Sequence, residues 1–423
     1  MNKMTPQIRF QGFTDDWEER KFFESMASTI DFRGRTPKKL GMDWSESGYL
    51  ALSALNVKNG YIDPLADAHY GDENLYKKWM SGKELKKGQV LFTTEAPMGN
   101  VAQVPDNNGY ILSQRTVAFE TKEDMMTNDF LAVLLKSPLV SNNLSALSSG
   151  GTAKGVSQKS LKGLSITVPF DIDEQQKIGS FFKQLDDTIA LHQRKLDLLK
   201  EQKKGFLQKM FPKNGAKVPE LRFSGFADDW EERNLGNIAG NLSDGDWIES
   251  NHIFDTGKYR IVQTGNIGIG SFLDKPQNAK YFHQADFDEL KANEIFSGDI
   301  LISRLSDPAG RTSILPDLGV PAVTAVDVAI IRPTDNFNSE FLVSELNSSA
   351  ILSKVDSLAS GSTRKRISRK NLESVKISLP TFEEQQKIGS FFKQLDDTIA
   401  LHQRKLDLLK EQKKGFLQKM FVS

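Results

Sequence analysis

The sequence predicts an α+β protein in which two mixed α/β globular heads are separated by two long helices that pack on one another. Residues 174–211 recur letter for letter as residues 384–421, at an offset of 210 residues (384 − 174). A second repeat precedes each head, because PQIRFQGFTDDWEER at 6–20 returns as PELRFSGFADDWEER at 219–233. Self-similarity at this spacing indicates two copies of a domain-sized unit, and hence a pseudo-twofold internal repeat.

The longer repeat has the pattern of an amphipathic helix. Its apolar side chains recur at alternating steps of four and three, and only His192 and Lys203 interrupt them. No proline falls inside the repeat, and Leu, Lys, Gln and Glu favour helix. Because one helix alone would leave its apolar stripe exposed, we expect the two copies to cover each other. The stripe consists of Ile178, Phe182, Leu185, Ile189, His192, Leu196, Leu199, Lys203, Phe206 and Met210.

Each head is predicted to be a mixture of short strands and helices. In the first head, Val-, Ile-, Phe- and Thr-rich stretches predict strands. Asn59-Gly60 inside residues 57–62 predicts a hairpin turn, and Ser157 is expected to cap a short helix. The aromatic residues of the preceding repeat, Phe10, Phe13 and Trp17, are expected to dock on their own domain. The predicted strands are 49–52, 89–94, 100–104, 110–119 and 164–168, and the predicted helix is 128–136, before Pro138.

The second head repeats this order with little identity, so the scaffold is shared while the surfaces differ. Residues 88–105 correspond to 298–316, and residues 149–169 correspond to 360–380. Proline and glycine after residue 211 are expected to end the first helix. The expected domains are the first head with its lead-in (1–172), the first helix (173–211), a linker (212–218), the second head with its lead-in (219–382) and the second helix (383–423).

The composition is typical of a soluble globular protein, and the cytoplasm is the expected location. The 423 residues are 38% hydrophobic and 26% charged, with 55 basic and 55 acidic side chains and no cysteine. We expect no signal peptide, and no apolar run approaches the roughly 20 residues that a membrane span needs. A net charge of zero does not exclude nucleic acid, because local patches matter more than the sum.

Catalytic signatures are missing from the sequence. There is no GxxxxGK[ST] phosphate loop, no GxSxG elbow and no Asn-Pro-Pro or Asp-Pro-Pro motif of an amino-methyltransferase. Asp67, Glu84 and Lys86 only loosely match a metal-nuclease pattern, and such spacing often arises by chance. The five histidines are too far apart in sequence to form a metal pair. We therefore expect no catalytic residue and no metal site.

The head loops instead carry side chains suited to DNA. Arg, Asn and Gln pair with base edges, while Lys and Ser contact phosphates. The strongest signal is the basic run at 364–370, which contains no acid. The predicted DNA-binding residues are Arg33, Arg35, Lys38, Lys58, Arg115, Lys154, Lys159, Arg304, Arg311, Arg364, Lys365, Arg366, Arg369 and Lys370, with Asn56, Gln114, Gln263, Thr264 and Asn266 as further polar candidates.

Over nearly its whole length the chain resembles the specificity subunit of type I restriction–modification enzymes. The resemblance rests on LRFSGFADDWEER, on ISLPTFEEQQKIGSFFKQLDDTI and on the duplicated helix. It implies that each head is a target-recognition domain for half of a bipartite DNA sequence. It also implies that the helices form an antiparallel coiled coil that sets the spacing.

The resemblance further implies double-stranded DNA, two methyltransferase subunits and restriction–translocase subunits as partners. S-adenosylmethionine, ATP and Mg are expected on those partners, with no cofactor on this chain and no membrane contact. Two other classes stay open. A coiled-coil scaffold would form oligomers without salt-sensitive DNA affinity, and an enzyme with unrecognised motifs would turn over substrate as an isolated chain.

Overall fold

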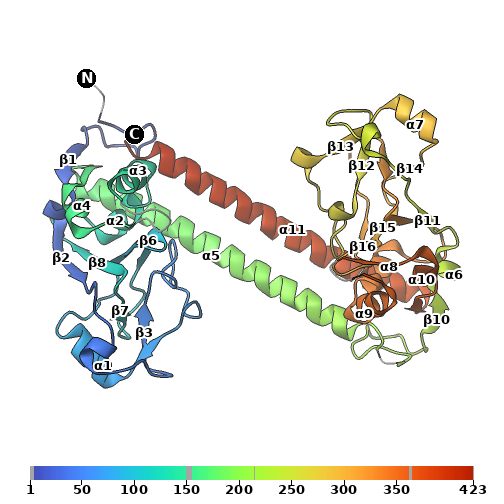
Figure 1. Ribbon diagram of the computed structural model, residues 1–423, viewed down its shortest axis with the longest axis horizontal. Coiled ribbons are helices and arrows are strands. Elements are labelled where there is room, and N and C mark those ends of the chain that lie inside the picture. Colours follow the sequence, from blue (N-terminus) through green and yellow to red (C-terminus); the bar gives the residue numbers. More distant parts are fainter. Residues whose placement is uncertain (1–3, 149–154, 214, 362–363, 423) are drawn as a thin grey trace. The chain divides into compact units, whose positions relative to one another are not determined.

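The computed structural model describes residues 4–148, 155–213, 215–361 and 364–422. The chain divides into two compact units, one of residues 1–192 with 405–423 and one of residues 193–404. The long helices α5 (Ile172–Lys209) and α11 (Phe382–Lys419) each begin in one unit and end in the other (Figure 1). Each unit therefore contains one head, the start of the helix that follows it and the end of the other helix.

The first head is built on a four-stranded antiparallel sheet in the order β2-β8-β5-β6 and a smaller sheet in the order β4-β3-β7. Its strands are β1 (Glu18–Lys21), β2 (Met26–Asp31), β3 (Tyr49–Leu52), β4 (Tyr70–Gly71), β5 (Val90–Thr94), β6 (Met98–Gln103), β7 (Ile111–Leu112), β8 (Thr116–Thr121) and β9 (Ser165–Val168). Its helices are α1 (Glu73–Met80), α2 (Asn128–Leu134), α3 (Pro138–Leu147) and α4 (Gln158–Gly163). Strand β1, from the lead-in, pairs with β9 just before α5.

The second head repeats the larger sheet in the order β11-β19-β15-β17, and its second sheet, in the order β13-β12-β18-β14, repeats β4-β3-β7 with one further strand, β14. Its strands are β10 (Glu231–Asn234), β11 (Ser243–Asp244), β12 (Tyr259–Val262), β13 (Lys280–Phe282), β14 (Glu294–Ile295), β15 (Ile300–Ser303), β16 (Leu305–Ser306), β17 (Thr312–Ile314), β18 (Ala322–Thr324), β19 (Val328–Ile331), β20 (Lys365–Arg366) and β21 (Lys376–Leu379). Its helices are α6 (Leu235–Ala239), α7 (Gln284–Leu290), α8 (Ser339–Leu346), α9 (Ser349–Leu358) and α10 (Arg369–Glu373).

The core of the first unit is closed by the end of α11. Trp17 of the lead-in packs edge-on against Phe130 of α2 and against Phe421, with ring centroids 6.3 and 6.0 Å apart. Phe130 and Phe421 stack at 6.0 Å. All three side chains are buried, and burying aromatic rings is strongly stabilising. The tail after α11 is therefore a structural part of the first unit.

The second unit repeats this aromatic trio with the end of α5. Trp230 packs against Phe211 at 6.2 Å and against Phe341 of α8 at 5.7 Å. Phe211 and Phe341 also lie 5.7 Å apart. The residue that closes each core thus belongs to the helix that follows the other head.

A buried ion pair fixes each lead-in to the start of the following helix. Arg9 binds both carboxylate oxygens of Glu174 at 2.6 and 2.8 Å, and Arg222 binds Glu384 at 2.7 and 2.8 Å. Both glutamates are fully buried, and their hydrogen bonds raise the pKa of Arg9 and of Arg222. A bidentate pair of this kind fixes geometry as well as charge. The repeated helix sequence begins with the motif EQQKI at 174 and again at 384, and its first Glu therefore has a structural role.

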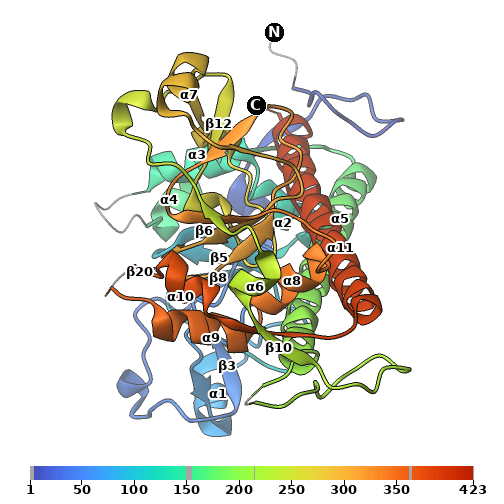
Figure 2. The ribbon, with the colours of Figure 1, turned by 90° about the vertical axis from the view of Figure 1, so that its right-hand side faces the viewer.

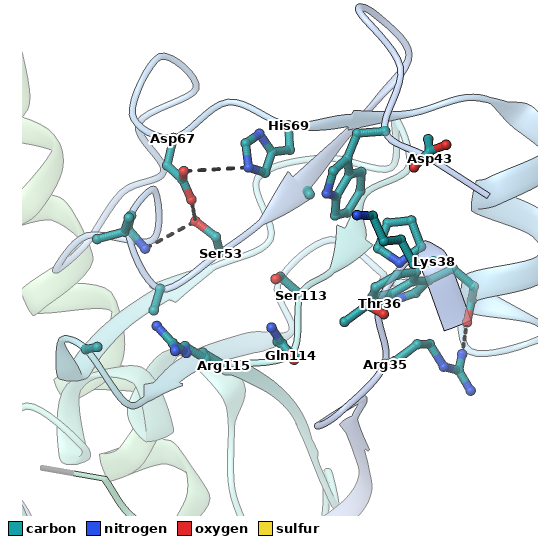
Figure 3. Close-up of a pocket in the computed structure, with 17 residues that line it drawn as sticks. Arg35, Thr36, Lys38, Asp43, Ser53, Asp67, His69, Ser113, Gln114 and Arg115 are labelled. Carbon is teal, nitrogen blue, oxygen red and sulfur yellow. Dashed lines mark hydrogen bonds and ion pairs between the residues drawn. The ribbon is translucent and has the colours of Figure 1, made fainter. Parts of the chain in front are cut away.

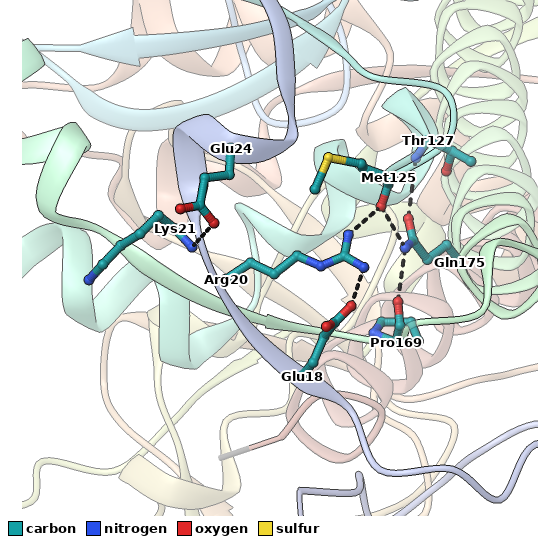
Figure 4. A network of polar contacts seen from close by, with 8 residues as sticks. All are labelled: Glu18, Arg20, Lys21, Glu24, Met125, Thr127, Pro169 and Gln175. Atoms are coloured by element: carbon teal, nitrogen blue, oxygen red, sulfur yellow. Dashed lines mark hydrogen bonds and ion pairs between the residues drawn. The ribbon is translucent and has the colours of Figure 1, made fainter.

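The next residue of the motif, Gln175, links three segments of the first unit (Figure 4). Its Nε2 donates to the carbonyl oxygens of Met125 at 3.1 Å and Pro169 at 2.9 Å. Its Oε1 accepts from the Thr127 amide at 3.2 Å, and Arg20 Nη1 donates to the same Met125 carbonyl at 2.9 Å. These bonds satisfy backbone groups between the head and the helix that would otherwise be buried without partners.

Within each unit, the two long helices run in opposite directions. In the first unit Phe181 of α5 packs on Phe416 of α11 at 5.1 Å. In the second unit Phe206 packs on Phe391 at 5.0 Å, and Lys203 pairs with Asp396 at 2.5 Å. Every stripe residue of α5 predicted from the sequence is buried or half-buried. Lys203, which interrupts the apolar stripe, is thus paired with an acid of the facing helix.

The prediction of one strand over residues 110–119 is wrong. The structure places β7 and β8 in different sheets and separates them at Ser113, Gln114 and Arg115. Strands β1 (EERK) and β2 (MASTID) were not predicted, because neither sequence shows a clear alternation of apolar residues. Ser157 does cap α4, since its hydroxyl accepts from the Ser160 amide at 3.0 Å.

Among the described residues, no single helix is long and apolar enough to cross a membrane; α2 and α3 meet that criterion only jointly, as a pair bent by 68°.

Glu345 is a buried carboxyl in the core of the second head. Its Oε1 accepts a hydrogen bond from the Ser378 amide at 2.7 Å, and burial raises the pKa of Glu345 to about 8. The first head has Leu134 at this place, four residues after Phe130, as Glu345 lies four residues after Phe341. At this buried position only the second head therefore carries a titratable group.

We expect this carboxyl to make the stability of the second unit fall as the pH rises. The folded state keeps a proton that the unfolded state releases above its ordinary pKa of 4.5. The contribution is therefore complete below about pH 4.5 and is lost as the pH rises through the folded pKa of about 8. Glu345→Gln keeps an acceptor for Ser378 but does not titrate. Its melting temperature relative to wild type should climb between pH 5 and 8, and parallel pH profiles would contradict this expectation.

Candidate nucleic-acid interface

Two adjoining cavities of about 440 Å³ each hollow the first head. Gln114 and Arg115, in the turn between β7 and β8, line both cavities. Figure 3 shows the one that Arg35, Lys38 and His69 also line. The break between β7 and β8 thus places an amide and a guanidinium in a concave surface.

The cavity in Figure 3 has an aromatic wall. The ring centroid of Trp44 lies 5.7 Å from that of Trp79 and 5.6 Å from that of His69, and both ring pairs are tilted. The buried Trp79 donates its indole N–H to the Leu112 carbonyl at 2.9 Å. Arg35 donates to the Trp79 carbonyl and covers the Phe32 ring at 4.3 Å. Arg35 is therefore held against the head by both of these contacts.

The second cavity is lined by Arg33 and by the residues that lead into α4. Arg33 Nε pairs with Asp31 at 2.9 Å, and Arg33 Nη1 donates to the Val156 carbonyl at 3.1 Å. Arg115 faces Glu95 at 3.9 Å. Of the remaining predicted residues of the first head, Lys38 and Lys159 are exposed and Lys58 is half-buried. Lys154 lies outside the described residues.

In the second head the predicted basic run lies on β20 and α10, beside α9 (Figure 2). The run contains no acid in sequence, but in the structure acidic side chains from other segments surround it. Lys365 pairs with Asp356 at 2.5 Å, and Arg366 pairs with Asp327 at 2.7 Å. Arg369 lies 3.7 Å from Asp244 and 3.4 Å from Glu373, while Arg364 and Lys370 are exposed. These contacts orient the arginines and partly neutralise them.

Two predicted residues of the second head lie deeper than expected. Arg304 is only 5% exposed, pairs with Asp244 at 3.1 Å and donates to the Val326 carbonyl at 2.6 Å. Its place in the interior argues against the predicted contact with DNA, because its guanidinium is used inside the head. Arg311 is half-buried.

Some of the further polar candidates also have internal roles. Asn56 is fully buried and donates to the Ala51 carbonyl at 2.6 Å. The Asn266 side chain accepts from the Gln263 amide at 3.0 Å and donates to the Leu273 carbonyl at 3.0 Å. These two asparagines stabilise loops, whereas Gln114 faces the cavities.

Sequence reasoning missed Asp31, Asp244 and Gln158. Gln158 Nε2 donates to Asp31 Oδ2 at 2.8 Å. Gln158 could have been noticed, because the predicted correspondence of 149–169 with 360–380 sets it against Arg369. The aspartates lie in strands that were not predicted, so no sequence signal indicated them.

The loosely nuclease-like residues do not gather into a metal site. Asp67 accepts from the Ser53 hydroxyl at 3.0 Å and faces His69 at 3.8 Å. In the part of the chain that the structure describes, no group of three or more His, Asp or Glu side chains is placed to hold a metal ion.

Comparison with known proteins identifies the architecture. The family model of the type I restriction modification DNA specificity domain matches residues 15–201 and 227–411. The putative type I restriction enzyme MjaX specificity subunit of Methanocaldococcus jannaschii is 24% identical, over 95% of this chain and 92% of its own length. The MjaVIII specificity subunit of the same organism is 23% identical, over 73% of this chain and 72% of its own length.

Solved structures agree in fold. The S subunit of a type I restriction–modification system from M. genitalium superposes with a TM-score of 0.66 at 16% identity, covering 99% of this chain and 100% of that one. A chain from a structure on the complex assembly and conformational transition of the type I R-M system gives a TM-score of 0.52 at 19% identity, covering 96% and 98%. Two matched domains span most of the sequence, and the chain therefore belongs to the family of type I restriction–modification DNA specificity proteins.

Proposed function

We propose that this chain is the DNA sequence-specificity subunit of a type I restriction–modification complex, with each head reading one half of a bipartite target. The observation that carries the proposal is that one scaffold presents two different polar surfaces. The four-stranded sheets share their strand order, while corresponding residues around them differ in charge, such as Gly155 and Arg366, or Arg115 and Asp327. A scaffold protein that does not bind specific DNA gives no reason for the two surfaces to differ.

The proposed partners are double-stranded DNA, two methyltransferase subunits and restriction–translocase subunits. Two shallow grooves, of about 460 and 410 Å³, support binding of one kind of partner twice. Phe10, Lys177 and Phe181 line the first groove, and Phe223, Lys387 and Phe391 line the second at corresponding positions. The long helices are proposed to pair as an antiparallel coiled coil along their length, which would extend the antiparallel contacts seen within each unit.

Catalysis is proposed to reside on the partner subunits, which would hold S-adenosylmethionine, ATP and Mg, with no cofactor on this chain. The test is co-expression with the methyltransferase subunit, followed by genome-wide mapping of methylated sites. We expect one asymmetric bipartite sequence with a fixed spacer. Methylation by this complex without any bipartite sequence would overturn the proposal.

Replacing Arg364, Lys365, Arg366 and Arg369 with alanine is expected to weaken DNA binding and to flatten its salt dependence. Each lost phosphate contact should lower the log–log salt slope by about 0.9. The matched control removes four exposed charges from α11 instead, through alanines at Arg404, Lys405, Lys410 and Lys414. For both variants, the affinity of the methyltransferase complex for its target is measured over a range of salt concentrations. Equal slopes for the two variants would remove the basic run from the interface.

A further inference from the structure

The strand register shows that Asp31 and Asp244 occupy the same place in the two heads. Asp31 of β2 is opposite Val117 of β8, which in turn is opposite Phe92 of β5. Asp244 of β11 is opposite Ala329 of β19, which is opposite Ile302 of β15. Phe92 and Ile302 are each the third residue of the central strand, after Val90 and Ile300. Each aspartate therefore ends the corresponding edge strand of the corresponding sheet.

Each of these aspartates contacts the first residue of a short helix, α4 in the first head and α10 in the second. Gln158 follows the cap Ser157 and donates to Asp31 at 2.8 Å. Arg369 follows the cap Ser368 and pairs with Asp244 at 3.7 Å. The same backbone bond supports both helices, since Val156 N donates to Thr94 O and Ile367 N donates to Arg304 O, each at 3.0 Å.

We propose that Gln158 and Arg369 are equivalent base-reading residues, one in each head, and that Asp31 and Asp244 are the positioning residues that orient them. Both side chains are exposed, and Ser157, next to Gln158, lines the second cavity together with Arg33. Base reading by these residues presupposes the DNA-recognition function proposed above.

The hydrogen-bonding groups left over match two different bases. A carboxylate only accepts, so Asp31 holds one N–H of the Gln158 amide and leaves one N–H and the carbonyl oxygen. One donor beside one acceptor is the pattern that pairs with N7 and N6 of adenine. Arg369 keeps N–H donors beyond those that face Asp244 and Glu373, and paired donors match N7 and O6 of guanine.

The neighbouring acids favour a base edge over a phosphate as the ligand. The acids leave no net positive charge to attract a phosphate, because Asp31 offsets Arg33 beside Gln158, while Asp244 and Glu373 offset Arg304 and Arg369. A base edge in the major groove carries no formal charge. The aspartates therefore select against phosphate contacts at these two positions while keeping the side chains in place.

The test exchanges the two residues in the complete methyltransferase complex. Gln158→Arg is expected to change one position of the first half-site from A·T toward G·C and to leave the second half-site unchanged. Arg369→Gln is expected to do the reverse in the second half-site only. Gln158→Ala should relax that same position, with discrimination falling about 5- to 150-fold. Genome-wide methylation mapping determines the target sequence of all three variants.

Asp31 is tested through the orientation that it imposes. Asp31→Ala should relax the position that Gln158→Ala relaxes, whereas Asp31→Asn, which still accepts from the Gln158 amide, should retain it. If Gln158→Ala keeps the wild-type base preference throughout the first half-site, the inference is overturned while the proposed function stands. If the wild-type complex itself recognises no bipartite sequence, the proposed function fails instead.

Discussion

A fragment of residues 1–211 is expected to form a homodimer that, with the methyltransferase subunit, modifies a palindromic sequence. The first unit needs the end of α11, because Phe421 completes the core with Trp17 and Phe130. The fragment lacks that helix but carries an identical helix end at residues 209–211. A second copy can therefore supply Phe211 where the whole chain uses Phe421.

The symmetry of the expected target follows from the symmetry of the dimer. Two identical heads in a twofold dimer read the same half-site in opposite directions. Residues 219–423 should likewise dimerise, since their Phe421 can replace Phe211 beside Trp230 and Phe341. Sedimentation gives the oligomeric state of each fragment, and methylation mapping gives its target.

A single side chain provides the control. Phe211→Ala in fragment 1–211 removes the ring that closes the partner's core, and deleting a buried aromatic ring costs about 3–5 kcal/mol. Phe211 is not one of the aromatic residues that pack in the fragment's own head. The substitution should therefore reduce dimerisation more than it disturbs the fold of that head. Monomeric, soluble fragments would contradict the exchange of helix ends, as would dimers with an asymmetric target.

The sequence predicted the duplicated architecture but not which helix end completes which head. Residues 209–211 and 419–421 are identical, so no pattern distinguishes Phe211 from Phe421. Only the contacts show that each closes the core of the other head. The docking of Trp17 was predicted correctly, because a large aromatic side chain in a lead-in must bury its surface somewhere.

The candidate interface could be predicted only in part. Arg364 to Lys370 were chosen because no acid lies among them in sequence, yet Asp244, Asp327 and Asp356 come to them through the fold. Arg304 was predicted as a loop cation but follows directly on β15 and is turned into the core. Pairings between distant segments of this kind depend on strand register, which short strands such as β11 do not reveal in sequence.

Lengthening both long helices by one heptad is expected to change the spacing between the half-sites. Helices α5 and α11 are each 38 residues long, and each passes from one unit into the other. Duplicating residues 189–195 in α5 and 399–405 in α11 preserves the alternation of four and three. Seven residues add about 10.5 Å, which corresponds to about three base pairs. If the helices set the spacing, the spacer should lengthen by that amount, or modification should be lost.

The insertion changes the length of the helices without breaking the contacts between them within each unit. The pairs Lys203–Asp396 and Lys413–Asp186 lie on either side of the insertion and stay intact in both units. The control lengthens α5 alone, which leaves α11 seven residues too short for both ends to reach their cores. That variant should lose thermal stability, whereas the double insertion should keep it. Three base pairs also turn one half-site by about 100° around the DNA axis, so a lower affinity is expected. Altered half-site bases at an unchanged spacing would refute the role of the helices as a ruler.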